Sequence, residues 1–249
     1  MKTWSKICTV AGLAFSTIAA ADTVTLQWDS PVFNPFVAPN PINVSTDGGT
    51  TSQSVRAGRF QGSALGVTGS IATSELLDGP DDLWTYCYDL FQFIQNGETV
   101  TYNVNYSGPM ARTLDFLGAV DYVLSGNSNS WSDPFAWLHP ANRSIAAAIQ
   151  IGIWESLYDT SGWSLDTGLF QASGLEADTL TQYTLFQNAV NSASVNDLPA
   201  ALAFTVESQT NQDQITGRVV PQQDLPEPGS LALIALAGML AAVTRRRWR

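Results

Sequence analysis

Two apolar segments, one at each end of the chain, limit the folded part of this protein to the residues between them. At the N-terminus, Lys2 and Lys6 accompany an apolar run over residues 7–18, and the small residues 19–21 follow. A positive start, a short apolar core and a small-residue end are the pattern of a secretory signal peptide. We therefore expect residues 1–21 to be removed on export.

The C-terminal segment has three features in a fixed order. Pro226, Glu227 and Pro228 come first, an apolar run over residues 230–243 follows, and arginines fill most of residues 245–249. A run of about 14 apolar residues is shorter than the roughly 20 that a stable transmembrane helix needs. The arginines favour a cytoplasmic end. This order is typical of a signal that a membrane protease or transpeptidase reads and removes.

These C-terminal residues resemble the PEP-CTERM sorting signal, whose Pro-Glu-Pro is matched by Pro226, Glu227 and Pro228. The resemblance covers residues 224–249. It implies an exosortase as processing partner, a Gram-negative host, and transient residence in the inner membrane through the tail. The mature protein is then expected at the cell surface or in the extracellular matrix. The alternative is an uncleaved C-terminal anchor, which would also hold the domain outside the inner membrane.

The stretch between the two end segments, residues 22–223, is long enough for one sizeable domain. Hydrophobic residues make up 45% of the whole chain, which suffices to bury a core. All 22 acidic residues but only five of the 11 basic residues lie between Asp22 and Gly229, a net charge of −17. This charge excludes nucleic acid as a partner, because phosphate binding needs a basic surface. It also favours the solubility of an exported protein.

The order of the predicted elements indicates an α+β domain in which antiparallel strands flank a mostly helical middle segment. Alternating or aromatic-rich runs predict strands over residues 23–28, 59–71, 82–94, 99–106, 202–206 and 214–220. Apolar residues at helical spacing predict helices over residues 111–124, 140–158 and 178–193. The proline-rich stretch 29–55 reads as a loop, and Asn96-Gly97 as the turn of a hairpin.

After export the domain holds one cysteine, Cys87, because Cys8 leaves with the signal peptide. A free thiol in an oxidising compartment tends to be oxidised or cross-linked, so its presence needs an explanation. One explanation is that Cys87 is an inert buried hydrophobe in the aromatic run 84–90. The other is that its sulfur has a chemical role.

A glutamine in the most apolar predicted helix is the second unusual residue. Gln150 has alanine, isoleucine and tryptophan side chains on or near its face of the helix. Burying an unpaired amide costs about 1–3 kcal/mol, so Gln150 needs a hydrogen-bond partner or a covalent one. A loop carbonyl would meet the first requirement.

Together, these residues resemble the Cys–Gln thioester domain of bacterial surface adhesins. In that family a cysteine follows an aromatic residue on a strand, as Cys87 follows Tyr86. A later helix has the pattern hydrophobic-Gln-x-hydrophobic-hydrophobic-Trp, which the residues around Gln150 match except that Gly152 replaces a small hydrophobic residue. The resemblance spans residues 84–158. The family is best known from Gram-positive bacteria, which use a different sorting signal.

The resemblance implies that the Cys87 thiol attacks the side-chain carbonyl of Gln150, expels ammonia and leaves an internal thioester. An amine would then be captured as an amide and a hydroxyl as an ester. The expected function is covalent attachment to an extracellular protein or polysaccharide, in adhesion or biofilm anchoring. Such a domain reacts once, so it is not expected to be an enzyme, and it needs no cofactor.

Other interpretations use the same residues. His139, the only histidine, would be the base of a cysteine hydrolase if it met Cys87, or an assistant in opening a thioester. The simplest interpretation places it in a loop before the 140–158 helix. A passive matrix or carbohydrate-binding module would use exposed Trp and Tyr for stacking. A metal site is not expected, because the sequence has no Cys/His cluster and Asp81-Asp82 is typical of a loop.

Overall fold

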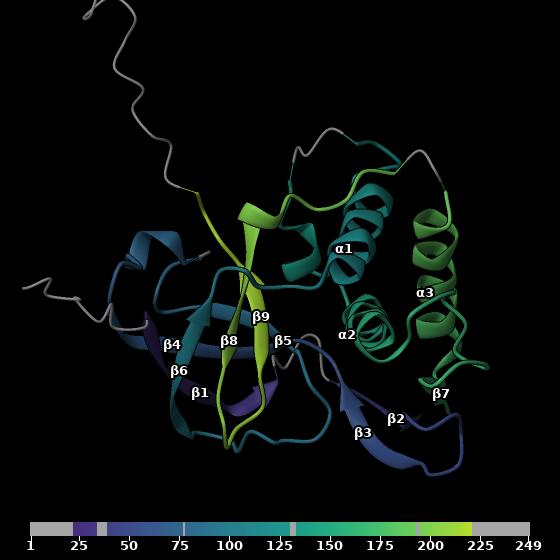
Figure 1. The fold of residues 1–249 in the computed structure, drawn as a ribbon, viewed down its shortest axis with the longest axis horizontal. Coiled ribbons are helices and arrows are strands. Elements are labelled where there is room, and N and C mark those ends of the chain that lie inside the picture. The colour runs from purple at the N-terminus through teal and green to yellow at the C-terminus, as the bar shows by residue number, and fades with distance from the viewer. Residues whose placement is uncertain (1–21, 34–38, 77, 130–132, 193–194, 221–249) are drawn as a thin grey trace, which may run out of the picture.

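The computed structural model describes residues 22–33, 39–76, 78–129, 133–192 and 195–220. The predicted signal peptide and sorting signal lie outside these ranges. Within them, the chain forms a closed six-stranded antiparallel barrel, a three-stranded sheet and three α-helices that stand beside the barrel (Figure 1). No helix in these ranges has the length and apolar character needed to cross a membrane.

The barrel has the strand order β1-β4-β5-β9-β8-β6. Its strands are β1 (Thr23–Phe33), β4 (Phe60–Thr68), β5 (Leu83–Cys87), β6 (Thr99–Asn105), β8 (Ala203–Glu207) and β9 (Gln214–Gly217). In β1 the alternate residues Val24, Leu26 and Trp28 are buried, as expected of a strand with one face toward a core. The Trp28 indole N–H donates to the hydroxyl of Tyr102 at 3.3 Å, which adds a side-chain bond between the neighbouring strands β1 and β6.

The last two barrel strands come from the end of the described chain. β8 pairs with β9, and the two join β6 on one side to β5 on the other. The predicted closing strands over residues 202–206 and 214–220 are therefore confirmed, with bounds shifted by up to three residues. Their pairing brings the end of the chain against β5, the strand that carries Cys87.

The smaller sheet has the order β3-β2-β7, with β2 (Asn40–Ser45), β3 (Gln53–Ala57) and β7 (Gln171–Ser173). Although β2 is its middle strand, β7 pairs only with residues 43–45. Pro41 lies outside that ladder and pairs only toward β3. A proline is tolerated here because one side of the strand needs no backbone donor at this position.

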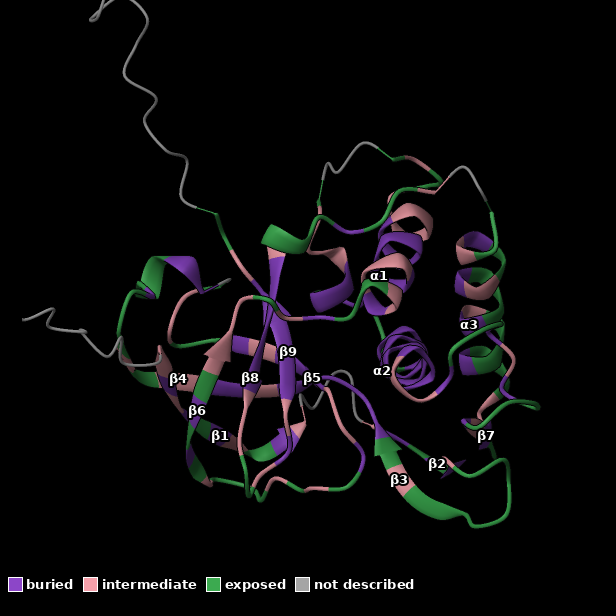
Figure 2. Ribbon diagram, in the orientation of Figure 1, coloured by how far each residue is buried: buried purple, intermediate pink, exposed green. Residues whose placement is uncertain are grey.

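The helices α1 (Ala111–Leu124), α2 (Arg143–Tyr158) and α3 (Ala177–Val190) pack against one another. α2 is the central one: every residue from 144 to 156 is buried, and Figure 2 shows the helix purple over most of its length. It begins after Asn142, whose side-chain oxygen accepts from the Ile145 N–H at 3.0 Å. The predicted start at Pro140 is therefore three residues too early.

Gly152 of α2 lies directly against the Phe116 side chain of α1. A Cβ at this position would lie 1.8 Å from the ring of Phe116, far inside van der Waals contact. The Phe116 ring itself packs against the rings of Trp163, Tyr183 and Phe186. The glycine that departs from the adhesin pattern therefore makes room for an aromatic side chain of the neighbouring helix.

The expectation of an α+β domain with strands flanking a mostly helical middle is wrong, because the described chain is mostly β. The three helices lie close to the predicted ranges. The β content was underestimated because β2 and β3 come from the stretch 29–55, whose prolines and glycines indicated a loop. The predicted hairpin is also absent: β5 pairs with β4 and β9, whereas β6 pairs with β1 and β8.

Candidate functional site

Cys87 and Gln150, which are 63 positions apart in the sequence, are in direct contact. Cys87 is the last residue of β5, and Gln150 lies in the middle of α2. The Gln150 Oε1 accepts from the Cys87 backbone N–H at 2.9 Å, and its Nε2 donates to the Cys87 carbonyl at 2.9 Å. The amide thus pairs with the end of β5 as a neighbouring strand would. This pairing satisfies a glutamine that is 0% exposed.

The sulfur of Cys87 has a different partner. Its thiol donates to the side-chain oxygen of Gln212 at 2.9 Å, and the Gln212 Nε2 donates to the Asp89 carbonyl at 3.2 Å. Gln212 belongs to the segment just before β9. Three glutamines therefore meet Cys87: Gln150 pairs with its backbone, Gln212 accepts from its sulfur, and Gln214 lies opposite it on β9, where its side chain also interacts with the thiol.

The Asp89 carboxylate bonds to two segments that flank the contact between Cys87 and Gln212. One carboxylate oxygen accepts from the Phe91 and Gln92 N–H groups at 3.1 Å, which fixes the turn after β5. The other accepts from the Asp213 N–H at 2.7 Å, which ties that turn to the segment carrying Gln212. A carboxylate that accepts several backbone N–H bonds is a rigid support. The position of Gln212 relative to the sulfur therefore depends on Asp89.

Burial controls the state of the thiol. Cys87 is 1% exposed, and burial raises the pKa of its thiol well above the ordinary value, with the negative charge of Asp89 adding to the effect. The sulfur is therefore protonated at neutral pH, in agreement with its donation to Gln212. Since the thiolate is the form that reacts with oxidants and attacks disulfides, a buried neutral thiol resists both reactions.

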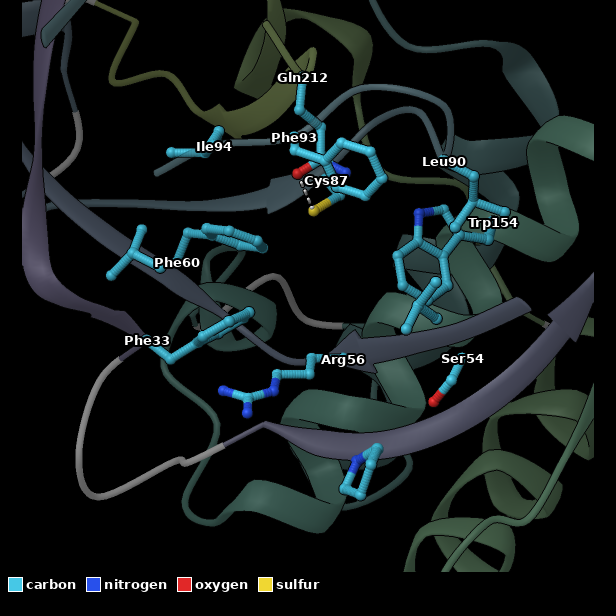
Figure 3. Close-up of a pocket in the computed structure, with 13 residues that line it drawn as sticks. Phe33, Ser54, Arg56, Phe60, Cys87, Leu90, Phe93, Ile94, Trp154 and Gln212 are labelled. Carbon is cyan, nitrogen blue, oxygen red and sulfur yellow. Dashed lines mark hydrogen bonds between the residues drawn. The ribbon is translucent and has the colours of Figure 1, made fainter. Parts of the chain in front are cut away.

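A cleft of about 460 Å³ opens beside Cys87 where the barrel, the small sheet and α2 meet. Figure 3 shows the thiol hydrogen bond at the inner end of this cleft, with Trp154 and Leu90 on one side and Phe60 and Phe33 on the other. Phe93, which is 73% exposed, stands at the rim. The walls are mostly apolar, so a ligand in the cleft would meet the sulfur in surroundings that hold little water.

The structure does not bring His139 to Cys87. The His139 ring bonds to the Asp78 carboxylate at 3.0 Å and packs edge-on against Trp84, with ring centroids 4.6 Å apart. Gln212 contacts the sulfur of Cys87 instead, and Gln150 and Gln214 pair with its backbone. Within the described ranges, no group of three or more His, Cys, Asp or Glu side chains is arranged to hold a metal ion.

Sequence reasoning missed Gln212 and Asp89. Gln212 lies in the polar run Asn211-Gln212-Asp213, directly before the predicted strand 214–220. Its role depends on the pairing of β9 with β5, a contact between segments more than 120 residues apart. No local pattern encodes such a pairing. The Tyr86-Cys87 and Gln150 motifs, by contrast, were visible because each lies within one element.

The predicted sorting residues Pro226, Glu227 and Pro228 lie outside the described ranges, so sequence comparison carries their assignment. Residues 224–247 match the PEP-CTERM protein-sorting motif. This match confirms the sorting signal and implies an exported, surface-associated protein with an exosortase as its processing partner. No curated protein and no solved structure matches the chain. The domain between the ends is therefore interpreted from its own geometry.

Proposed function

We propose that Cys87 and Gln150 form an internal thioester, with which the exported protein attaches itself covalently to an amine or hydroxyl group on an extracellular protein or polysaccharide. The observation that carries this proposal is the pair of 2.9 Å hydrogen bonds between the buried Gln150 amide and the Cys87 backbone. These bonds hold the acyl group of one residue against the residue that bears the nucleophile.

The bond-forming step joins the Cys87 sulfur, which donates to Gln212 in the structure, to the side-chain carbon of Gln150, whose amide contacts the Cys87 backbone. The Cys87 sulfur attacks the Gln150 amide carbon, the C–N bond breaks, and the thiol proton leaves with the nitrogen as ammonia. Negative charge develops on Gln150 Oε1 during the attack, and the Cys87 N–H already donates to that oxygen at 2.9 Å. A backbone donor aimed at a developing oxyanion is a strong source of stabilisation in a buried site.

The surroundings protect the product. Trp154 is 1% exposed and Leu90 is 2% exposed, and both line the cleft at Cys87. Excluding water from the site slows hydrolysis of the thioester. The Trp154 indole N–H is buried without a hydrogen-bond partner, so it can donate to a group that enters the cleft. Capture of one nucleophile consumes the thioester, so the protein acts as a covalent anchor without turnover.

The captured group is expected on another molecule. The lysines in the printed sequence are Lys2 and Lys6, both in the predicted signal peptide. From Asp22 onward the domain therefore has no lysine side chain that would consume its own thioester. This composition supports attachment to a foreign surface over cross-linking between copies through lysine.

A passive binding module is the second candidate, and it is favoured by the exposed ring of Phe93 at the cleft and the exposed ring of Phe91 nearby in the sequence. Stacking on tryptophan receives less support: Trp28, Trp137 and Trp154, all within the described ranges, are almost completely buried. A cysteine hydrolase would need a base at Cys87, and His139 bonds to Asp78 instead.

Methylamine separates the candidates. The wild-type exported protein should gain one methylamine, detected by intact mass and located on Gln150 by peptide sequencing. Cys87→Ala and Gln150→Ala should gain none, because thiol and acyl group are both required, and near-ultraviolet circular dichroism should show that they remain folded. His139→Ala should react like wild type. Addition of methylamine to Cys87→Ala would refute the proposal, since no thioester exists in that variant.

A further inference from the structure

The cleft at Cys87 holds no group that would activate a hydroxyl. Among the described residues that line it, none is Asp, Glu or His, and the one charged side chain is Arg56. The nearby Asp89 carboxylate accepts from backbone N–H groups with both of its oxygens. A hydroxyl needs a base to become a good nucleophile, whereas an uncharged amine attacks without one. The lining therefore favours amines.

Gln212 places a hydrogen-bond acceptor at the reacting sulfur. Its Oε1 lies 2.9 Å from the Cys87 Sγ, and the side chain is only 7% exposed at the inner end of the cleft (Figure 3). Its amide is held in one orientation, because Nε2 donates to the Asp89 carbonyl. If the amide were flipped, Gln212 Oε1 would face the Asp89 carbonyl oxygen, and two acceptors would meet without a donor.

Thioester formation removes the thiol proton, and Gln212 Oε1 then loses its donor. The oxygen remains fixed beside the sulfur as a buried acceptor without a partner. An incoming amine carries N–H donors and needs its lone pair turned toward the acyl carbon. An N–H donated to Gln212 Oε1 would hold the amine at the sulfur side of the thioester.

We propose that Gln212 is the residue that positions a primary amine for attack on the thioester, and that the site selects amines over hydroxyls. This inference rests on the proposed thioester. In the step, a bond forms between the amine nitrogen and the Gln150 acyl carbon, the C–S bond breaks, and one amine proton ends on the Cys87 sulfur. The proton stays on the sulfur, and the regenerated thiol again donates to Gln212 Oε1, as it does in the structure.

The test compares variants of the exported protein by intact mass and by the rate of methylamine capture at fixed pH. Gln212→Ala removes the acceptor, and Gln212→Met removes it while keeping the length of the side chain. The matched control is Gln92→Ala, which loses a hydrogen bond to the Gln209 carbonyl but does not line the cleft. Glycerol serves as the hydroxyl probe.

We expect both Gln212 variants to remain one ammonia lighter than the unmodified chain, which shows that the thioester forms. Their rate constants for methylamine should fall by roughly tenfold to a hundredfold, the effect of one lost hydrogen bond in a buried site. Gln92→Ala should react at the wild-type rate, and glycerol should react far more slowly than methylamine with the wild type.

Capture at the wild-type rate by both Gln212 variants would overturn the inference. Full unmodified mass in both would also overturn it, because Gln212 would then be needed to form the thioester or would itself be the acyl donor. Glycerol capture as fast as methylamine capture would refute the selectivity. Failure of the thioester itself looks different, since the wild-type protein would then show the full mass and add neither probe.

Discussion

At the scale of single residues, Gln150 and Glu155 are both fully buried on α2 but differ in their hydrogen bonding. Both amide atoms of Gln150 are paired, whereas the Glu155 carboxyl faces the Asp159 carboxylate, to which it can donate only when protonated, and the Arg112 guanidinium lies 3.7 Å away. Burial raises the pKa of Glu155 to about 8, the charge of Asp159 adds to the rise, and Arg112 opposes it. Glu155 is therefore buried as the neutral acid.

This shift predicts a stability that falls as pH rises. The folded state keeps a proton on Glu155 that the unfolded chain releases near pH 4.5, so the contribution is complete below that pH and is lost toward pH 8. The free energy of unfolding should drop by about 2–4 kcal/mol between pH 5 and pH 8. Urea unfolding at the two pH values measures it.

Two variants test whether Glu155 causes this pH dependence of the free energy of unfolding. Glu155→Gln carries no proton to lose, so its pH dependence should be clearly flatter than that of the wild type, with a remainder from Asp121 and Asp213, whose pKa values are raised to about 6, mainly by burial. Asp166→Asn changes an exposed carboxyl and should leave the slope as it is. A Glu155→Gln slope equal to that of the wild type would show that Glu155 is ionised in the folded protein.

The sequence predicted the residues of the candidate site only where one element carries the signal. Tyr86-Cys87 lies within one strand and Gln150 within one helix, so each could be read locally, and the need of a buried amide for a partner suggested that they meet. Gln212 could not be found this way, because its contact with the sulfur depends on the pairing of β9 with β5. His139 was considered only as the sole histidine, and the structure places it with Asp78.

At the scale of elements, the packing of α1 on α2 depends on one glycine. Gly152→Ala should destabilise the protein by about 1–3 kcal/mol, because the added methyl overlaps the Phe116 ring and three further rings hold that ring in place. This cost exceeds the roughly 1 kcal/mol that alanine gains over glycine from helix propensity. Chemical unfolding measures the difference.

A second substitution, on α1, tests whether the overlap with the Phe116 ring causes this loss of stability. Phe116→Leu removes the ring, so Gly152→Ala should cost clearly less in that background than in the wild type, a positive coupling between the two positions. Equal costs in both backgrounds would contradict the packing explanation. Gln150 also lies on α2, whereas Cys87 lies on β5, so a shifted helix should lower the yield of thioester in Gly152→Ala as well.

The elements themselves were predicted with unequal success for a physical reason. Helices are encoded by spacing within one segment, and the predicted 111–124 helix coincides with α1. A barrel is encoded by pairings between distant segments, such as β1 with β6 and β5 with β9, which leave no local mark. Pro41 made β2 harder to predict, because a proline usually argues against a strand. It is tolerated in β2 because β7 does not pair with this part of the strand.

At the scale of the whole molecule, export and sorting set the conditions in which the domain works. The PEP-CTERM match at residues 224–247 implies release from the cytoplasm and processing by an exosortase. An oxidising exterior would threaten an accessible free thiol. The burial of Cys87, which its sequence context left open, is therefore consistent with a sulfur that is either shielded or already used in a thioester.

Processing predicts that protein recovered from the cell surface of the native host lacks residues 230–249. Mass analysis of the C-terminal peptide measures this directly. Replacing Pro226, Glu227 and Pro228 by alanines should leave the tail in place and hold the protein in the membrane fraction. Detection of the intact tail on wild-type protein at the surface would show instead that the segment is a permanent anchor.

The intact mass of freshly purified wild-type protein tests the central claim most directly. A Cys87–Gln150 thioester makes the exported chain lighter by one ammonia and leaves no titratable thiol in the unfolded protein until a nucleophile is added. We predict that lower mass, with the linkage located between the peptides that contain Cys87 and Gln150. The full unmodified mass together with one titratable thiol would contradict the account and leave the domain as a passive surface module.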